Sequence, residues 1–242
     1  MIQTFVLIKR LFIMVQTRSP DPSADTKTAL LDAAERLFSR EGIAESSLRA
    51  ITSRAGVNLA SVNYHFGSKE GLVRAVFARR LGPLNRQRLD SLERCVERGQ
   101  GVADLRCLLR AFVHPAVTMM TSQDAGDREF VKLMGRTLFE PSGELRSKMV
   151  EEFREVGERF TLELGRTLPA APQEEIVWRF HFMVGSMAHT VAARYMVSHQ
   201  LECLNLPEEH DPDSIANRLV SFLLSGWDGL ATATTSEEDS EP

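Results

Sequence analysis

Residues 47–69 read SLRAITSRAGVNLASVNYHFGSK, and this stretch decides the fold. In its first half the apolar side chains return at the spacing of one helix face: Leu48, Ile51 and Ala55. Ser47 stands where a hydroxyl can cap the first free amides of a helix. Gly56 is suited to end that helix, because a C-terminal residue with positive φ is most often glycine. The pattern predicts a short helix over 48–55.

The second half repeats the pattern after one tight turn. Asn58 can cap a second helix, and Gly67 ends it. Its apolar face is predicted to hold Leu59, Val62 and Phe66. Two short helices joined by a glycine turn predict a helix-turn-helix.

The outward face of the second helix carries small, amide, aromatic and imidazole side chains and no acid: Ala60, Ser61, Asn63, Tyr64 and His65. A helix that enters the major groove of DNA needs small residues for close approach and polar tips for base edges. Arg49 lies outward on the first helix, and Lys69 follows the second. An ordinary solvated helical hairpin has the same spacing, so spacing alone leaves both interpretations open.

Three runs of residues resemble the N-terminal domain of TetR-type transcriptional repressors: AAERLFSREG (33–42), SSLRAITSRAG (46–56) and GVNLASVNYHFGSKEGL (56–72). The resemblance covers about residues 26–81. It implies an all-α repressor that binds double-stranded operator DNA as a dimer and releases it when a small ligand enters its second domain.

By position, the resemblance implies a base contact at Arg49, recognition-helix contacts at Ala60, Ser61, Asn63 and Tyr64, and phosphate contacts at His65 and Lys69. Many members carry tyrosine where Asn63 stands, so the operator sequence is not carried over. The predicted DNA-binding residues are Ser47, Arg49, Asn58, Ala60, Ser61, Asn63, Tyr64, His65 and Lys69.

Charge is distributed unevenly along the chain. The formal net charge is −4, but residues 26–81 hold nine Lys and Arg against five Asp and Glu, whereas residues 82–242 hold 17 against 26. A basic module on an acidic body is expected of a protein that touches phosphate with one end.

Four regions are predicted: a flexible extension over 1–24, a DNA-binding domain over 25–81, an effector-binding and dimerisation domain over 82–230, and a disordered acidic tail over 231–242. The first residues, MIQTFVLIKRLFIMVQTR, are broken by Lys9 and Arg10, so they predict no membrane span, and they lack the order of a signal peptide. Met14 is an alternative start to Met1.

The three cysteines, Cys95, Cys107 and Cys203, are too few and too scattered to predict a disulfide framework or a zinc site. We expect small buried hydrophobic residues in a reducing cytoplasm, with redox sensing as the alternative. No cofactor or metal is expected.

Further helices are predicted at 26–41, 68–81, from Pro83 to about Arg98, 102–120, 126–140, 143–168, 174–199 and 212–230. Gly82-Pro83 is expected to interrupt the helix that begins after Ser68, and His114-Pro115 to kink the helix over 102–120. The helix over 68–81 joins the two domains. It is either a plain linker or, as we expect, a helix that transmits tilt from one core to the other.

A kink opens space beside a helix, and soft side chains adapt to a flexible ligand. The predicted effector site therefore comprises His114, Met119, Met120, Phe130, Met134, Phe153 and Phe180, although such residues also fill ordinary cores. Arg136, Arg179 or Arg194 would receive a carboxylate at the mouth of the site, although an ordinary surface charge is the alternative for each. The runs LGPLNRQRL (81–89) and VWRFHFMVGSMA (177–188) resemble a fatty-acid-responsive subgroup, which implies a fatty acid or an acyl thioester as effector.

The helix over 174–199 is apolar on two faces, so it is either fully buried or shared with another subunit. The helix over 212–230 is also broadly apolar. Together they predict a homodimer, with interface residues Trp178, Phe182, Gly185, His189, Ala192, Val220, Leu223 and Trp227.

Enzyme motifs are missing from the sequence: the six histidines include no HExxH, and there is no Gly-rich phosphate loop or GxSxG elbow. The chain is therefore predicted not to be an enzyme. The stronger rival is a helical scaffold that never touches DNA. The outward face of the second short helix and the charge asymmetry favour DNA, and they leave repression and activation both open.

Overall fold

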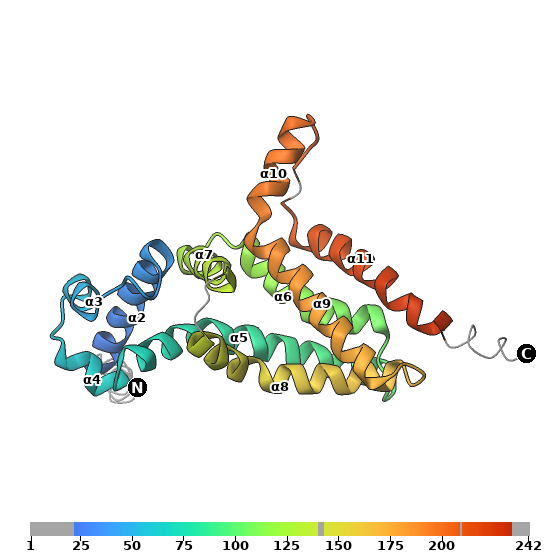
Figure 1. The fold of residues 1–242 in the computed structure, drawn as a ribbon, viewed down its shortest axis with the longest axis horizontal. Helices are drawn as coiled ribbons and strands as arrows, with labels where there is room; N and C mark the ends of the chain where they lie inside the picture. Colours follow the sequence, from blue (N-terminus) through green and yellow to red (C-terminus); the bar gives the residue numbers. More distant parts are fainter. Residues whose placement is uncertain (1–21, 140–142, 209, 234–242) are drawn as a thin grey trace, which may run out of the picture.

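The computed structural model describes residues 22–139, 143–208 and 210–233, which form ten helices and no strand (Figure 1). The predicted all-α class is confirmed. The predictions for residues 1–21 and 234–242 lie outside the described residues.

The N-terminal module consists of α2 (Pro22–Glu41), α3 (Leu48–Ala55) and α4 (Ala60–Phe66). Its three helices share one small core whose members are buried, as their spacing predicts: Leu30, Ala34, Leu37, Phe38, Ile51 and Val62. A core of this size gains from docking on a larger body.

Helix α5 (Lys69–Arg98) begins at Ser68, whose hydroxyl accepts a hydrogen bond from the Gly71 amide at 3.1 Å. It continues through Pro83 as one helix of 30 residues, so the predicted break at Gly82-Pro83 is wrong. A proline removes one hydrogen bond from a helix at a cost of about 3 kcal/mol. The buried stripe on both sides of Pro83 outweighs this cost, because it packs against α6 and α8: Leu81, Leu84, Arg88, Leu92 and Cys95.

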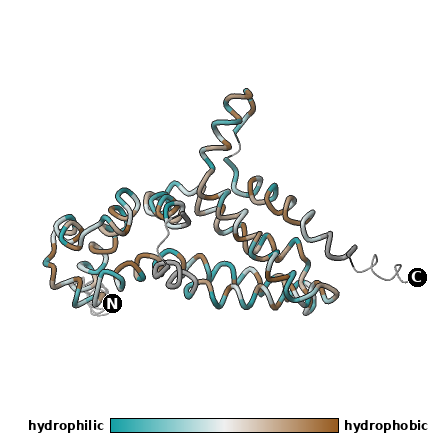
Figure 2. The backbone as a smooth tube through the Cα atoms, in the orientation of Figure 1, coloured by the Kyte–Doolittle hydropathy of each residue, from teal (hydrophilic) through white to brown (hydrophobic). Residues whose placement is uncertain are grey.

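The body comprises α6 (Leu105–Thr121), α7 (Ala125–Phe139), α8 (Gly143–Thr167), α9 (Gln173–Ala192) and α11 (Pro212–Ala233). Helix α6 is central, since it packs against α5, α7, α8, α9 and α11. Helix α8 lies along α5, and hydrophobic and hydrophilic residues alternate along this pair (Figures 1 and 2). This alternation matches helices with one face in a core.

The single helix predicted over 174–199 is two helices. Helix α9 ends at Ala192, Ala193 has φ −110° and ψ 20°, and α10 (Arg194–Cys203) runs in a new direction, away from the body (Figure 1). None of the residues of α10 is buried. An ion pair between Arg194 and Glu208, 3.6 Å long, ties the base of α10 to the returning chain.

A disulfide joins Cys95 near the end of α5 to Cys107 at the start of α6, with 5.8 Å between their Cα atoms. The expectation of three unpaired, buried cysteines is therefore wrong. Spacing did not reveal the pair because it depends on the short connection that folds α6 back onto α5. Cys203 is free and exposed.

Candidate nucleic-acid interface and ligand cavity

Local hydrogen bonds position the two short helices as the sequence predicts. The Ser47 hydroxyl accepts from the Ala50 amide at 3.1 Å, and Asn58 Oδ1 accepts from the Ala60 amide at 3.0 Å. Gly56 has φ 68°, in the left-handed region that favours glycine. Ser47 thus caps α3 as predicted, whereas Asn58 binds the first amide of α4 from the position before its N-cap residue, Leu59.

The outward face of α4 is open to solvent. Tyr64 is 80% exposed, and its ring meets the edge of His65 with 4.9 Å between centroids. Ala60, Asn63 and Arg49 are also exposed, while Ser61 and His65 are half-buried. Leu59, predicted to face inward, is 40% exposed because it precedes the first turn of α4.

Lys69 has a structural contact as well as an outward position. Its ammonium donates to the Ala44 carbonyl at 3.1 Å, which ties the start of α5 to the loop before α3. An ammonium has three N–H donors, so two remain for a phosphate oxygen. Residues 46–69 contain no Asp or Glu, so this surface carries no carboxylate of its own that would repel phosphate.

A mostly apolar cavity of about 70 Å³ lies between α5, α6, α7, α8 and α9. The structure brings together there four of the seven predicted effector-site residues: Met119, Phe130, Met134 and Phe153. Val131, Met187 and Val191 add further apolar lining. Arg88 also lines the cavity, although it was not among the predicted carboxylate partners.

The other three predicted effector-site residues lie elsewhere. His114 Nε2 contacts Asp213 Oδ1 at 2.9 Å and so joins α6 to α11. Phe180 packs its ring on Phe112, 5.2 Å between centroids, and Met120 is half-buried outside the cavity lining. Helix α6 runs through Pro115 without ending there.

The predicted arginines also have other partners. Arg136 donates to the carbonyls of Ser39 and Arg40, Arg179 pairs with Glu175 at 3.4 Å, and Arg194 pairs with Glu208. The sequence itself contains an indication that the Arg88 side chain is buried. Arg88 occupies a regular position of the apolar stripe of α5, where a leucine is expected.

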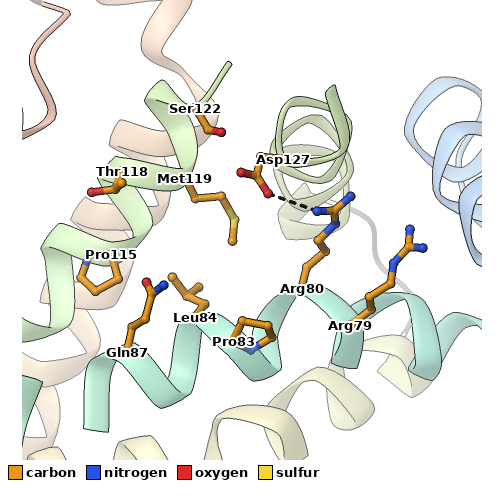
Figure 3. Close-up of a pocket in the computed structure, with 10 residues that line it drawn as sticks. All are labelled: Arg79, Arg80, Pro83, Leu84, Gln87, Pro115, Thr118, Met119, Ser122 and Asp127. Carbon is orange, nitrogen blue, oxygen red and sulfur yellow. Dashed lines mark hydrogen bonds and ion pairs between the residues drawn. The ribbon is translucent and has the colours of Figure 1, made fainter. Parts of the chain in front are cut away.

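A second hollow opens beside the cavity, between α5, α6 and α7 (Figure 3). We call this hollow, of about 220 Å³, the groove. Its lining is more polar and includes Arg80, Gln87, Thr118 and Asp127. Leu84 and Met119 line both the groove and the cavity, so these two side chains separate them.

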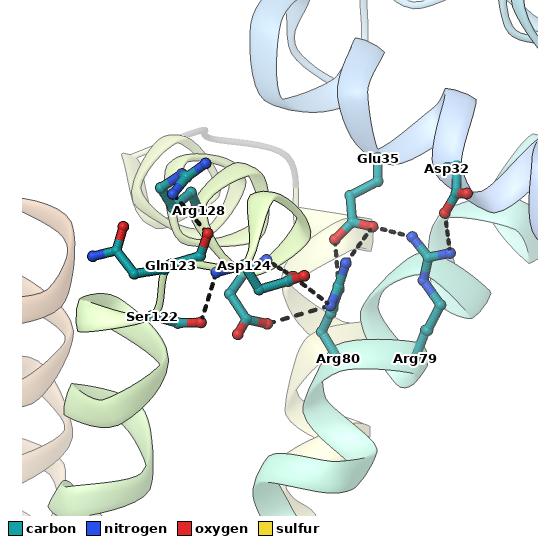
Figure 4. A network of polar contacts seen from close by, with 9 residues as sticks. Asp32, Glu35, Arg79, Arg80, Ser122, Gln123, Asp124 and Arg128 are labelled. Atoms are coloured by element: carbon teal, nitrogen blue, oxygen red, sulfur yellow. Dashed lines mark hydrogen bonds and ion pairs between the residues drawn. The ribbon is translucent and has the colours of Figure 1, made fainter.

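An ion-pair network joins the N-terminal module to the body (Figure 4). Glu35 of α2 is 4% exposed and accepts from Arg79 and from Arg80 Nε, the latter at 2.9 Å. Arg79 also pairs with Asp32 at 2.7 Å, and Arg80 with Asp127 of α7 at 3.3 Å. Burial lowers the pKa of Arg80, but the hydrogen bond and charge of Glu35, with the charge of Asp127, raise it above its ordinary value overall.

Helix α7 also contacts α2 directly. Ser39 donates a hydrogen bond to Glu129, and this bond is the main reason that the pKa of Glu129 is lowered. Arg136 reaches the carbonyl of Ser39 at 3.3 Å. Since Phe130 and Met134 of the same helix line the cavity, α7 lies between the cavity and the N-terminal module.

The predicted dimer residues separate into two groups. Trp178, Phe182, Gly185 and His189 of α9 are exposed, whereas Ala192 is half-buried and lies against Gly135 of α7. Three residues of α11 are buried within the protomer itself, so their assignment to a dimer surface is wrong: Val220, Leu223 and Trp227. Phe222, which was not predicted, is a large apolar residue of α11 that is 68% exposed.

Two further findings limit the kinds of site present. None of the described helices is both long and apolar enough to cross a membrane. Within the described parts of the chain, no cluster of His, Cys, Asp and Glu side chains is suited to hold a metal ion.

The structure thus consists of a helix-turn-helix module joined by a shared helix to a larger helical body that contains an apolar cavity. Two family models match the chain, "Bacterial regulatory proteins, tetR family" over residues 30–76 and "Tetracyclin repressor-like, C-terminal domain" over residues 110–226. The chain belongs to the TetR family of transcriptional regulators, a family of regulatory proteins and not of enzymes.

Curated relatives match over short segments. The HTH-type nicotine-responsive transcriptional repressor HdnoR of Paenarthrobacter nicotinovorans is 32% identical over 105 residues, 43% of this chain and 48% of that protein. The HTH-type transcriptional regulator TtgR of Pseudomonas putida is 34% identical over 59 residues, 24% of this chain and 28% of that protein. The chain thus spans less than half the length of these relatives.

Solved structures share the fold over most of both chains. The fatty acid degradation regulator FadR from Bacillus halodurans has a TM-score of 0.62 at 17% identity, with 87% of this chain and 98% of that chain covered. FadR from Bacillus subtilis, solved in complex with stearoyl-CoA, has a TM-score of 0.61 at 18% identity, with 82% and 98% covered.

Proposed function

We propose that the protein is a ligand-responsive repressor that binds operator DNA as a homodimer in the cytoplasm. The observation that carries the proposal is the acid-free, exposed face of α4, with Tyr64 at its centre. This face belongs to a module that matches the TetR family sequence.

On DNA, α4 enters the major groove and brings Asn63 and Tyr64 to base edges, with Arg49 contacting bases from α3. The remaining N–H groups of Lys69 and the imidazole of His65 bind phosphates. Two-fold symmetry of the dimer requires a near-palindromic operator, with half-sites about 34–36 Å apart. The exposed residues of α9, with Phe222 of α11, support a dimer contact at these helices.

The effector is a small apolar or amphipathic molecule, either a fatty acid or an acyl thioester, bound in the cavity. Support comes from the methionine and phenylalanine lining and from the sequence resemblance to fatty-acid-responsive regulators. The solved complex of the structurally similar FadR with stearoyl-CoA fits this class of effector.

The switch follows from the position of α7. A ligand that displaces Phe130 or Met134 moves the helix that carries Glu129 and Arg136, and these contact α2. The ligand changes DNA affinity only by its differential binding to the two arrangements. A tenfold loss of DNA affinity requires about 1.4 kcal/mol of coupling, within the usual range for allosteric proteins.

The test is selection of bound duplexes from a random pool, followed by titration of the selected duplex. Tyr64→Ala is expected to cost about 1–3 kcal/mol of binding and to relax base preference. Its thermal stability should stay unchanged, because the side chain is exposed. Leu162→Ala, at a half-exposed position of α8, is the control and should bind as wild type does. Absence of sequence preference at every salt concentration would refute the proposal.

A further inference from the structure

Arg88 is a fully buried cation in the middle of the body. Its side chain is 1% exposed, and Cζ lies 4.1 Å from the centroid of the Phe112 ring. Nε donates to the Phe112 carbonyl at 2.9 Å, one Nη to Asn85 Oδ1 at 3.2 Å, and the other Nη to Met187 Sδ at 3.2 Å. All three acceptors are neutral.

No carboxylate among the described side chains forms an ion pair with Arg88. Burial lowers the pKa of Arg88 to about 9, and no neighbouring charge offsets this effect. A guanidinium has five N–H groups, so two remain beyond the three bonds above. An unpaired buried charge is costly, and buried arginines are normally paired.

A structural role alone explains only part of this geometry. The bonds to Phe112 and Met187 connect α5 to α6 and α9, but an apolar side chain of similar length would fill the same space without the cost of a buried charge. Arg88 also lines the cavity, so a ligand in the cavity lies beside the Arg88 side chain.

We propose that Arg88 binds the carboxylate of a free fatty acid, which enters the cavity with its head group first. The inference rests on the proposed function and narrows its effector class. The hydrocarbon chain lies against Met119, Met134 and Phe153, which line the same cavity. An acyl-CoA carries no negative charge at its thioester carbonyl, and its bulky nucleotide does not fit a cavity of about 70 Å³.

The positions of the cavity and the groove indicate where the hydrocarbon chain of the fatty acid lies. The cavity, at about 70 Å³, admits a carboxylate and a few carbons. A longer chain continues between Leu84 and Met119 into the groove of about 220 Å³, because these side chains line both spaces. Methionine has three rotatable bonds, so Met119 can turn aside at little cost.

The experiment compares octanoate, laurate and palmitate with octanol and octanoyl-CoA by calorimetry on the full chain. Wild type is expected to bind the fatty acids and to prefer octanoate over octanol. Arg88→Met should weaken octanoate binding by about 10- to 100-fold, the loss of hydrogen bonds to a charged group, and leave octanol binding unchanged. Arg86→Met removes an exposed arginine from the same helix and should change neither.

Arg88→Lys provides a second variant in case Arg88→Met does not fold. Lysine keeps the positive charge but lacks the two parallel N–H donors of a guanidinium. Octanoate should therefore bind less tightly than to wild type and still be preferred over octanol. The proposal is overturned if wild type binds none of the three acids, if Arg88→Met keeps the preference for octanoate, or if octanoyl-CoA binds most tightly regardless of Arg88. These outcomes do not touch the DNA-selection result, which tests the proposed function separately.

Discussion

Gly71, in the first turn of α5, illustrates how a single residue positions the candidate recognition helix. A Cβ built on Gly71 would lie 1.9 Å from the carbonyl oxygen of Phe66, the last residue of α4. That oxygen belongs to the backbone and cannot rotate away as a side chain can. The absence of a side chain at Gly71 therefore sets how closely α4 approaches α5.

Gly71→Ala is expected to destabilise the N-terminal module and to abolish operator binding. Gly82→Ala on the same helix is the matched control, because its Cβ would meet only Arg86 Nη1 at 3.6 Å. It should be neutral, or stabilise by up to about 1 kcal/mol from helix propensity. Thermal denaturation with a DNA titration measures both variants, and equal behaviour would contradict this account.

The sequence predicts those residue-scale features that depend on neighbours in the chain. Ser47 and Gly56 act as expected because capping and left-handed turns are local, and Asn58 binds the first amide of α4 although Leu59 is the N-cap residue. Gly71 and Arg88 were not recognised, since a close approach and an unpaired charge become visible only when distant helices meet. The DNA contacts themselves stay a prediction.

At the scale of elements, α7 is the helix that links the cavity to α2. Its contacts with α2 complement the Glu35 network at the start of the body (Figure 4). The sequence predicts transmission through the helix over 68–81. The structure adds a second connection that bypasses that helix.

Glu35→Gln removes the charge shared by Arg79 and Arg80 and leaves both cations partly buried without it. Breaking a buried pair on one side costs about 3–5 kcal/mol, and we expect the lower end because the arginines are 24% and 23% exposed. Asp32→Asn removes the 47% exposed carboxylate beside Arg79 and should cost less than about 1 kcal/mol. Urea denaturation compares the two, and equal losses would exclude a special role for Glu35.

The sequence predicts that each helix except α10 exists. It does not predict several helix boundaries. Periodicity continues across Pro83 because the buried stripe does, so packing overrides the local signal for a break. The end of α9 at Ala192 has no such signal, since apolar residues continue into α10. The Cys95–Cys107 bridge depends on how α5 and α6 pair, which spacing does not specify.

For the whole molecule, exposed aromatic rings mark the surface at which two copies are proposed to meet. Trp178 and Phe182 of α9 lie 5.9 Å apart between centroids, and both are more than half exposed. Periodicity could not separate this surface from the protomer's own core, which is why Trp227 was assigned to the wrong side. Its 2% exposure makes it unsuitable for testing a dimer.

Phe182→Glu is expected to yield monomers of unchanged stability that hold operator DNA weakly, because the side chain is 60% exposed in the protomer and a charge would be buried in the dimer. Val102→Glu, at an exposed apolar position in the loop between α5 and α6, should leave the dimer intact. Sedimentation at micromolar concentration measures both variants. A monomeric wild type that still binds operator tightly would rule out the proposed assembly.

The projecting helix α10 has a consequence for the energetics of local opening. Isolated helices shorter than about 12–15 residues are marginal in water, and α10 has 10 residues, none of them buried. Its backbone hydrogen bonds are therefore expected to break and re-form without unfolding of the body. The free energy of this local opening should be among the lowest in the protein. Solvent deuterium is therefore expected to label α10 long before α6, and a slower labelling of α10 in an assembly would measure how strongly a neighbouring molecule holds this helix.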